Sequence, residues 1–305
     1  MKSKTYKSRL LSLLVRCYNA AIGIIFADKF VLNVITSRSK PNVVNLHYWN
    51  SSLEIGDECK NNLGDDLSEV IVSAVLAQKG LSLETKVKKK KHLYAVGSIV
   101  SMGYQNATVW GSGFLEDLSW IRRLVHHYPF RKLDIRAVRG PLTRDLLLKL
   151  GHKCPEVYGD PGILMPYVYM PESIQKEEDY ILIPHFSKEK EYRELYGDEH
   201  IVSMITNDYK DVVNKICSAR KVISSSLHGI ILAETYGTNA VFLKDRGNNK
   251  DFKYIDYYSS TLRPNYRYAT SVEEAIQMEP MDLPSNMEEL RESLIEVFPY
   301  DLWNN

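Results

Sequence analysis

The strongest concentration of reactive side chains lies in the segment 223–229, which reads ISSSLHG and joins an apolar strand-like run to an apolar helix-like run. The first backbone N–H groups of a helix lack intrahelical acceptors, and together with the helix dipole they bind anions. Histidine changes charge near neutral pH, so His228 can donate a proton to a bound anion or pair with it. The alternative is a capping serine beside a histidine held by packing. The residues of the expected anion site are Ser225, Ser226, Leu227, His228 and Gly229.

A second candidate is Arg139, which directly follows a strand-like run and precedes Pro141, a residue favoured in the first turn of a helix. Its planar guanidinium matches a carboxylate or a phosphate. A salt bridge without catalytic meaning is an equally good interpretation of this arginine from the sequence alone.

Several glycine-containing turns follow other predicted strands and let a backbone approach a ligand closely. They contain Gly64, Asp65, Gly97, Gly111, Ser112 and Gly113. Asp65 also fits the role of a helix N-cap. None of these turns has the spacing of a dinucleotide-binding or P-loop fingerprint, and no cluster has the spacing of metal ligands. The sequence therefore supports neither NAD, nor Walker-type ATP binding, nor a metal.

The elements that would position these residues alternate between strands and helices. Apolar runs predict strands over 43–46, 92–96, 107–110, 134–138, 180–184, 221–224 and 240–243, and helices over 65–78, 142–150, 208–219 and 229–236. Such alternation is typical of parallel sheets with helices on both faces, whose ligands gather at the carboxyl ends of the strands. We expect two α/β domains, 41–170 and 180–305, joined by the polar segment 171–179 and facing a cleft.

Composition narrows the class of protein. The 305 residues carry a formal net charge of +1, so nothing favours a nucleic-acid partner. Four scattered cysteines without CxxC spacing favour a reducing compartment. Residues 1–40 combine basic and apolar side chains, but the charge-free run 17–27 is shorter than the ~20 residues that span a bilayer. We expect a helix there that either lies on a membrane surface through residues 1–35 or covers the core or a partner subunit.

The ordered set of short motifs resembles the polysaccharide pyruvyl transferases over roughly residues 43–260. These motifs are NLGD (62–65), WGSG (110–113), VRG (138–140), GDP (159–161), SSLHG (225–229) and KYIDY (253–257). The resemblance implies two Rossmann-like halves similar to those of GT-B glycosyltransferases, phosphoenolpyruvate as donor, no cofactor, and a pyruvate ketal on a glycan, free or linked to polyprenyl diphosphate. It also implies a cytoplasmic protein, with a peripheral position on the membrane as one option.

The resemblance further implies that His228 is the general acid and Arg139 a donor anchor. Some members have arginine at the position of Ser226, so Arg246 or Lys253 would have to supply the missing charge. Asp65 or Asp160 would accept the hydroxyl proton, unless each serves only as a cap or turn residue. Two rival functions remain open: a nucleotide-sugar glycosyltransferase of GT-B type and a non-catalytic glycan-binding protein.

Overall fold

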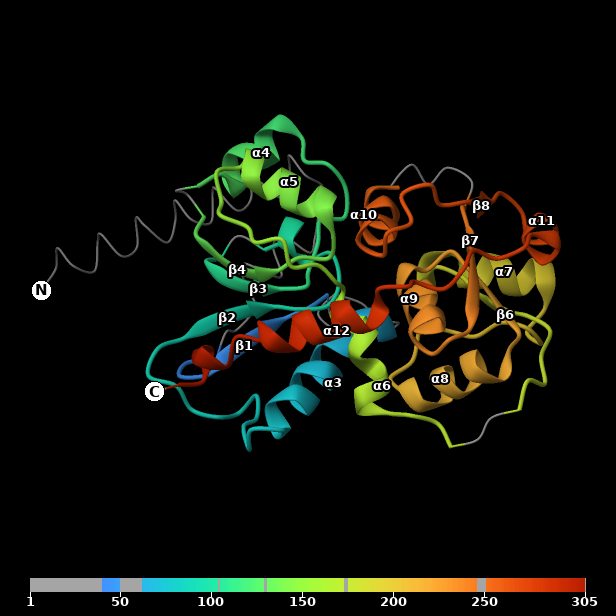
Figure 1. Ribbon diagram of the computed structural model, residues 1–305, viewed down its shortest axis with the longest axis horizontal. Coiled ribbons are helices and arrows are strands. Elements are labelled where there is room, and N and C mark those ends of the chain that lie inside the picture. Colours follow the sequence, from blue (N-terminus) through green and yellow to red (C-terminus); the bar gives the residue numbers. More distant parts are fainter. Residues whose placement is uncertain are drawn as a thin grey trace, which may run out of the picture.

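The chain contains two four-stranded parallel sheets (Figure 1). The computed structural model describes residues 40–49, 62–103, 105–128, 131–172, 175–245 and 251–304. The first sheet consists of β1 (Val44–His47), β2 (Lys91–Tyr94), β3 (Ala107–Trp110) and β4 (Leu133–Ala137), and the second of β5 (Ile181–Ile183), β6 (Lys221–Ser224), β7 (Asn239–Leu243) and β8 (Tyr268–Ala269). The predicted α/β class with parallel sheets is confirmed, whereas the helix expected within residues 1–40 lies outside the described residues.

Ten α-helices lie within the described ranges. They are α3 (Leu63–Ala77), α4 (Trp120–His126), α5 (Pro141–Lys149), α6 (Met165–Val168), α7 (Glu189–Tyr196), α8 (Tyr209–Ser218), α9 (Leu227–Thr235), α10 (Phe252–Ser260), α11 (Val272–Gln277) and α12 (Met287–Glu296). The four predicted helices correspond to α3, α5, α8 and α9. Helix α7 was not predicted, because its sequence EKEYRELY is mostly charged and the residues that pack on the core are Tyr192 and Tyr196, not aliphatic side chains.

The strands of the first sheet send alternate side chains into two cores, as the period of a strand requires. Leu93 and Trp110 pack on the face that α3 and α12 cover, whereas Tyr94 and Val109 pack on the face of α5. Figure 1 shows α4 and α5 on one side of this sheet and α3 and α12 on the other. Its described strands lie in chain order, without the reversal that a Rossmann-like half would show.

The second sheet does contain such a reversal. A parallel bridge joins Leu182 of β5 to Ile201, so the segment at residue 201 lies on one side of β5 and β6 on the other. Consistent with this arrangement, α7 packs on one face of the sheet and α8 and α9 on the opposite face. The carboxyl ends of β5 and β6 therefore form a topological switch point, where ligands of open α/β sheets bind.

One apolar core connects the two halves, because a single cluster of buried side chains includes residues of both sheets. The chain also returns to the first sheet at its end. The indole of Trp110 donates to the carbonyl of Leu294 in α12 (2.8 Å), and Arg136 forms an ion pair with Asp301 (2.9 Å). Residues after about 287 thus pack against the N-terminal half, although the sequence analysis grouped them with the C-terminal domain.

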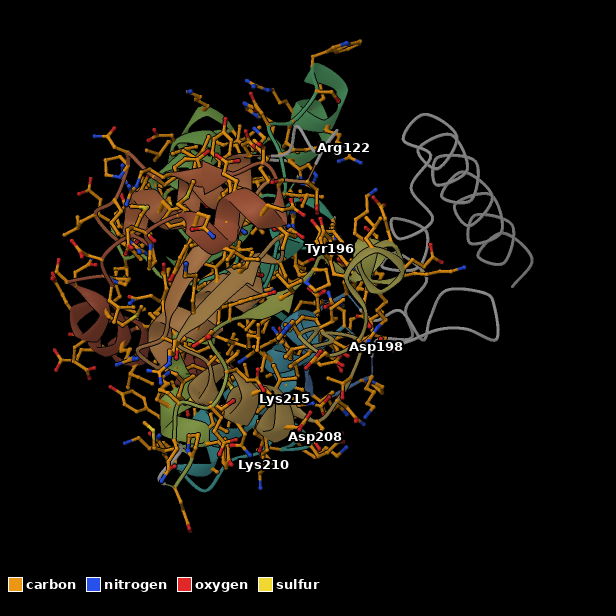
Figure 2. All side chains as sticks on the ribbon, turned by 90° about the vertical axis from the view of Figure 1, so that its right-hand side faces the viewer. Arg122, Tyr196, Asp198, Asp208, Lys210 and Lys215 are labelled. Atoms are coloured by element: carbon orange, nitrogen blue, oxygen red, sulfur yellow. The ribbon has the colours of Figure 1, made fainter. Side chains whose placement is uncertain are left out.

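The outer helices are amphipathic in the expected way. In α8, Val212, Val213 and Ile216 are buried, whereas Lys210 and Lys215 extend to the solvent (Figure 2). Within the described residues, no helix has both the length and the apolar character that crossing a bilayer requires.

Candidate functional site

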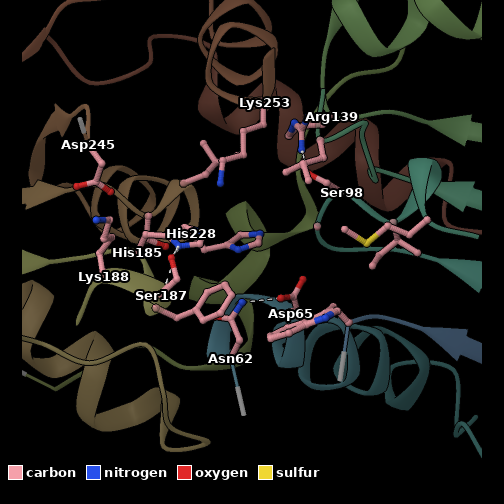
Figure 3. Close-up of a pocket in the computed structure, with 18 residues that line it drawn as sticks. Asn62, Asp65, Ser98, Arg139, His185, Ser187, Lys188, His228, Asp245 and Lys253 are labelled. Carbon is pink, nitrogen blue, oxygen red and sulfur yellow. Dashed lines mark hydrogen bonds between the residues drawn. The ribbon is translucent and has the colours of Figure 1, made fainter. Parts of the chain in front are cut away.

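The main pocket lies between the two halves, next to the switch point, and has a volume of about 490 Å³ (Figure 3). The N-terminal half contributes Trp49 after β1, Arg139 after β4 and Asp65 from the first turn of α3. The C-terminal half contributes residues 185–188, 226–228, Asp245 and Lys253. The pocket therefore brings together residues that are far apart in the sequence.

His228 lies at the centre of this pocket, in the first turn of α9 and not in the loop before the helix, where the sequence analysis placed it. The helix begins earlier than predicted because Ser226 caps it, with its hydroxyl accepting from the N–H of Gly229 (3.5 Å). A Cβ atom on Gly64 would overlap the imidazole of His228. Glycine at position 64 thus lets the start of α3 approach the histidine.

Asp160 lies behind His228 and is fully buried. Its Oδ1 accepts from the N–H of Gly162 (3.0 Å), and its Oδ2 faces the His228 Nε2 at 3.7 Å. Among the described residues, neither Oδ2 nor Nε2 has a hydrogen-bond partner, although both atoms are buried. Asp160 does not line the pocket, so its position suits orienting the imidazole better than accepting a proton from a substrate.

Asp65 does line the pocket and lies in the first turn of α3, whose N-cap is Asn62. The cap role considered for Asp65 is therefore wrong. Its Oδ2 accepts from the side-chain amide of Asn62 (2.6 Å). Burial raises the pKa of Asp65 to about 6, against the opposing charges of His228 and Lys253 and the hydrogen bond from Asn62. A carboxylate with such a pKa is suited to accept a proton near neutral pH.

Arg139 forms part of the pocket wall, but its side chain is fully buried and has three partners. It pairs with the buried Asp256 of α10 (3.2 Å) and donates to the Ser98 hydroxyl (2.9 Å) and the Phe114 carbonyl (2.5 Å). Burial raises the pKa of Asp256, and the guanidinium opposes this shift. Arg139 thus links the two halves, and direct contact with a donor stays a prediction.

The remaining cations of the pocket come from the C-terminal half. Lys253 lies in the first turn of α10, with its Nζ 5.0 Å from the centre of the Tyr254 ring. Lys188 forms an ion pair with Glu191 (2.6 Å). Arg246, the alternative to Lys253, lies outside the described residues. Lys253 is therefore the predicted substitute for the missing arginine that the structure brings into the pocket.

Most of the other predicted site residues lie behind the residues that line the pocket and contact them. Ser112 donates to the carbonyl of Gly97 (2.8 Å), and Ser225 accepts from the N–H of His185 (2.9 Å). A Cβ on Gly113 would overlap the Arg139 guanidinium, and one on Gly97, whose φ is +93°, would lie 2.8 Å from Asp65 Oδ1. Of the predicted site residues, those that do not line the pocket are Gly64, Gly111, Ser112, Gly113, Asp160, Ser225 and Gly229.

One group of lining residues was not predicted from the sequence, and Trp49, His185, Phe186 and Asp245 are its most prominent members. His185 and Phe186 directly follow the predicted strand 180–184, and Trp49 lies shortly after the predicted strand 43–46. The rule of strand carboxyl ends could therefore have found all three. Among the described residues, no group of three or more histidine, cysteine, aspartate or glutamate side chains is arranged to hold a metal ion.

Comparisons with known proteins show which family and which relatives the chain matches. The model of the polysaccharide pyruvyl transferase family matches residues 81–245, more than half of the chain. An uncharacterised protein of Acanthamoeba polyphaga mimivirus is 26% identical over 224 residues, which cover 70% of this chain and 73% of that protein. The succinoglycan biosynthesis protein ExoV of Rhizobium meliloti (strain 1021) is 26% identical over 240 residues, which cover 72% of this chain and 66% of ExoV.

A functionally uncharacterised protein of Klebsiella pneumoniae, known from its crystal structure, superimposes with a TM-score of 0.46 and 12% identity. The superposition covers 80% of this chain and 98% of the Klebsiella chain. The family match includes the pocket-lining residues from Gly97 to Asp245, whereas Trp49, Asn62, Asp65 and Lys253 lie outside the matched range.

Proposed function

Because the chain belongs to the polysaccharide pyruvyl transferase family, we propose that it transfers the pyruvyl group of phosphoenolpyruvate to a sugar and releases phosphate. The product is a cyclic pyruvate ketal on a surface polysaccharide or on its precursor linked to polyprenyl diphosphate, made at the cytoplasmic side of a membrane. The observation that carries this proposal is the pocket itself, in which an imidazole, an ammonium group, a helix start and a carboxylate of raised pKa face one space.

The donor is a small ester with a phosphate and a carboxylate, and both need cationic or N–H donors at short range. In our proposal, the phosphate binds at the start of α9, where Ser226 and Leu227 line the pocket. The first N–H groups of this helix and its dipole favour the negative charge. Lys253 pairs with the donor from α10 and supplies the charge that Ser226 does not carry.

The reaction requires an acid and a base on either side of the reacting carbon. Protonated His228 gives its proton to the methylene carbon, which becomes a methyl group and leaves an oxocarbenium-like centre. A sugar hydroxyl attacks this centre and passes its proton to Asp65, and the C–O bond to phosphate breaks. A second hydroxyl of the sugar then closes the ketal. Of the two hydroxyl protons, one replaces the proton taken from His228 and the other leaves with phosphate.

Asp160 acts in this scheme as a positioning residue. Its Oδ2 faces the Nε2 of His228 at 3.7 Å in a buried environment and stabilises the positive charge on the imidazole. Correct placement of the acid and base relative to the substrate contributes a large part of the catalytic effect. No step of this scheme needs a metal ion.

The test is phosphate release from phosphoenolpyruvate in the presence of glycan acceptors, with mass spectrometry of the product for a pyruvate ketal. We expect phosphate and ketal in equal amounts, and undiminished activity after dialysis against a chelator. Release of a nucleotide from a nucleotide sugar would favour a glycosyltransferase instead. Calorimetric binding of phosphoenolpyruvate without any turnover would favour a glycan-binding protein, and activity lost to the chelator and restored by Mg²⁺ would contradict the metal-free scheme.

We expect Asp65→Asn to lose activity and gain stability at neutral pH. A carboxyl whose folded pKa is about 6 lies above its usual value of 3.8, so its ionisation destabilises the fold. The penalty is absent below about pH 4, grows as the pH rises towards 6 and is constant above it. The thermal unfolding midpoint of the variant should therefore exceed that of the wild type at pH 7.5, with no difference near pH 4.

The neighbouring Asp66 provides the matched control. Burial also raises its pKa to about 6, but Asp66 does not line the pocket. Asp66→Asn should therefore gain stability over the same pH range and keep its turnover.

Wild-type activity should fall as the pH decreases through about 6, because the base becomes protonated. Full activity of Asp65→Asn at pH 7.5 would exclude Asp65 as the base.

A further inference from the structure

The pocket is larger than its proposed donor needs. Phosphoenolpyruvate has about ten non-hydrogen atoms, whereas a volume of about 490 Å³ is within the range that holds drug-sized ligands. The groups assigned to the donor occupy only part of the lining. In Figure 3, Lys253 lies on one side of His228, whereas Asn62 and Asp65 lie on the other.

An aromatic wall, which we define as Trp49 and Phe186, forms another part of the lining. The two ring centroids are 5.1 Å apart, with an interplanar angle of 34°. The ring of His185 lies 4.5 Å from that of Phe186 and extends the wall. Trp49 follows β1 and Phe186 follows β5, so each half supplies one member of the wall.

We propose that the aromatic wall is the acceptor subsite and that it binds the apolar C–H face of a pyranose ring. This inference rests on the proposed function, because it locates the second substrate of that reaction. Large aromatic side chains offer a flat apolar surface. A pyranose ring with equatorial hydroxyls presents a matching apolar face made of C–H groups. Placed on this wall, a sugar keeps its hydroxyls free to meet the polar side chains of the pocket.

Polar side chains around the wall match those hydroxyls. Asn62, Ser187 and Asp245 all line the same pocket. Asn62 contacts the proposed base directly, since its amide donates to Asp65. A sugar that reaches Asn62 thus places a hydroxyl near the carboxylate that takes its proton. Ligand pockets generally combine such an apolar surface with a few placed polar groups.

The exposure of the rings also favours a ligand over mere packing between the halves. Trp49 and Phe186 are each only partly buried, although the core beneath them contains many fully buried side chains. Both residues line the pocket. Covering it with a sugar removes apolar surface from water, and this stabilises the bound acceptor.

The first test measures Michaelis constants for Phe186→Leu and Trp49→Leu. We expect the constant for the acceptor to rise about tenfold in each, the size of effect that loss of one aromatic contact produces, with the donor constant unchanged within about twofold. Phe186→Tyr keeps the ring and should restore the acceptor constant. Trp120→Leu removes an indole that is 73% exposed on α4, outside the pocket, and should change neither constant.

The second test needs no turnover. Saturation-transfer NMR with the methyl glycosides of galactose, glucose, mannose and N-acetylglucosamine, recorded with phosphoenolpyruvate present, should show transfer to the C–H protons of one ring face for at least one sugar. This signal should be lost in Phe186→Leu and kept in Trp120→Leu. The absence of a signal for all four sugars, or a signal that survives in Phe186→Leu and Trp49→Leu, would overturn the proposal.

The two proposals fail in different ways. If the proposed function is wrong, the wild type releases no phosphate from phosphoenolpyruvate with any acceptor, whether or not it binds the compound in calorimetry. If only the acceptor subsite is wrong, the wild type releases phosphate and forms the ketal, and the aromatic variants keep the wild-type acceptor constant.

Discussion

Replacing His228 by alanine is expected to lower the turnover number at least about 100-fold, the usual scale for the loss of an acid–base group. The imidazole is in the middle of the pocket, at the start of α9, with the buried carboxylate of Asp160 behind it. The measurement is steady-state phosphate release from phosphoenolpyruvate with a saturating acceptor. The effect should appear in turnover more than in donor binding, because the start of α9 remains to bind the phosphate.

His127 offers a matched control, since it is exposed at the end of α4 and does not line the pocket. His127→Ala should retain wild-type turnover. His228→Gln keeps hydrogen-bonding groups of similar reach but cannot act as an acid near neutral pH, and should be as inactive as the alanine variant. Near-normal turnover in His228→Ala would remove this residue from the mechanism.

The second large effect is expected in stability. Arg139→Ala should lower the free energy of unfolding by about 3–5 kcal/mol, because it leaves the buried carboxylate of Asp256 without its partner. Arg139 and Asp256 are both fully buried, and Asp256 also accepts from the N–H of Thr143 (3.0 Å) and its hydroxyl (2.6 Å). Urea unfolding followed by circular dichroism measures this loss.

The double variant Arg139→Met with Asp256→Asn should recover part of the loss, since it leaves no unpaired buried charge. Arg123→Ala breaks an exposed pair with Asp117 and should cost less than about 1 kcal/mol. If Arg139→Ala unfolds like the wild type and only the Michaelis constant for phosphoenolpyruvate rises, Arg139 contacts the donor directly. That result would establish the anchor role that the family resemblance implies.

Strands with an apolar run between turn residues could be predicted closely from the sequence. The predicted strands 107–110 and 221–224 have the same bounds in the structure as β3 and β6. The side chains that pack inward from α10 and α7 are mainly tyrosines, and the other residues of α7 are mostly charged. Runs of aliphatic residues therefore do not mark these two helices, and neither was predicted.

The residues of the candidate site could likewise be predicted only in part. His228 was predicted because it follows an apolar strand and parallel strands bring their carboxyl ends to one edge of a sheet, and Asp65 because it lies in a glycine-containing turn that opens a helix. The need for glycine at positions 64 and 113 was visible, but its cause was not: side chains of His228 and Arg139 occupy the space that a Cβ would take. The pairing of Trp49 with Phe186 depends on how the two halves meet, and no local pattern encodes it.

The return of the chain to the first sheet restricts how the two halves can move. Within the described residues, the backbone passes from one half to the other before β5 and again before α12. A continuous core of buried apolar side chains also spans both halves. Any widening of the pocket that admits a long polymer must therefore leave both connections intact, and separating the halves costs the burial of that apolar surface.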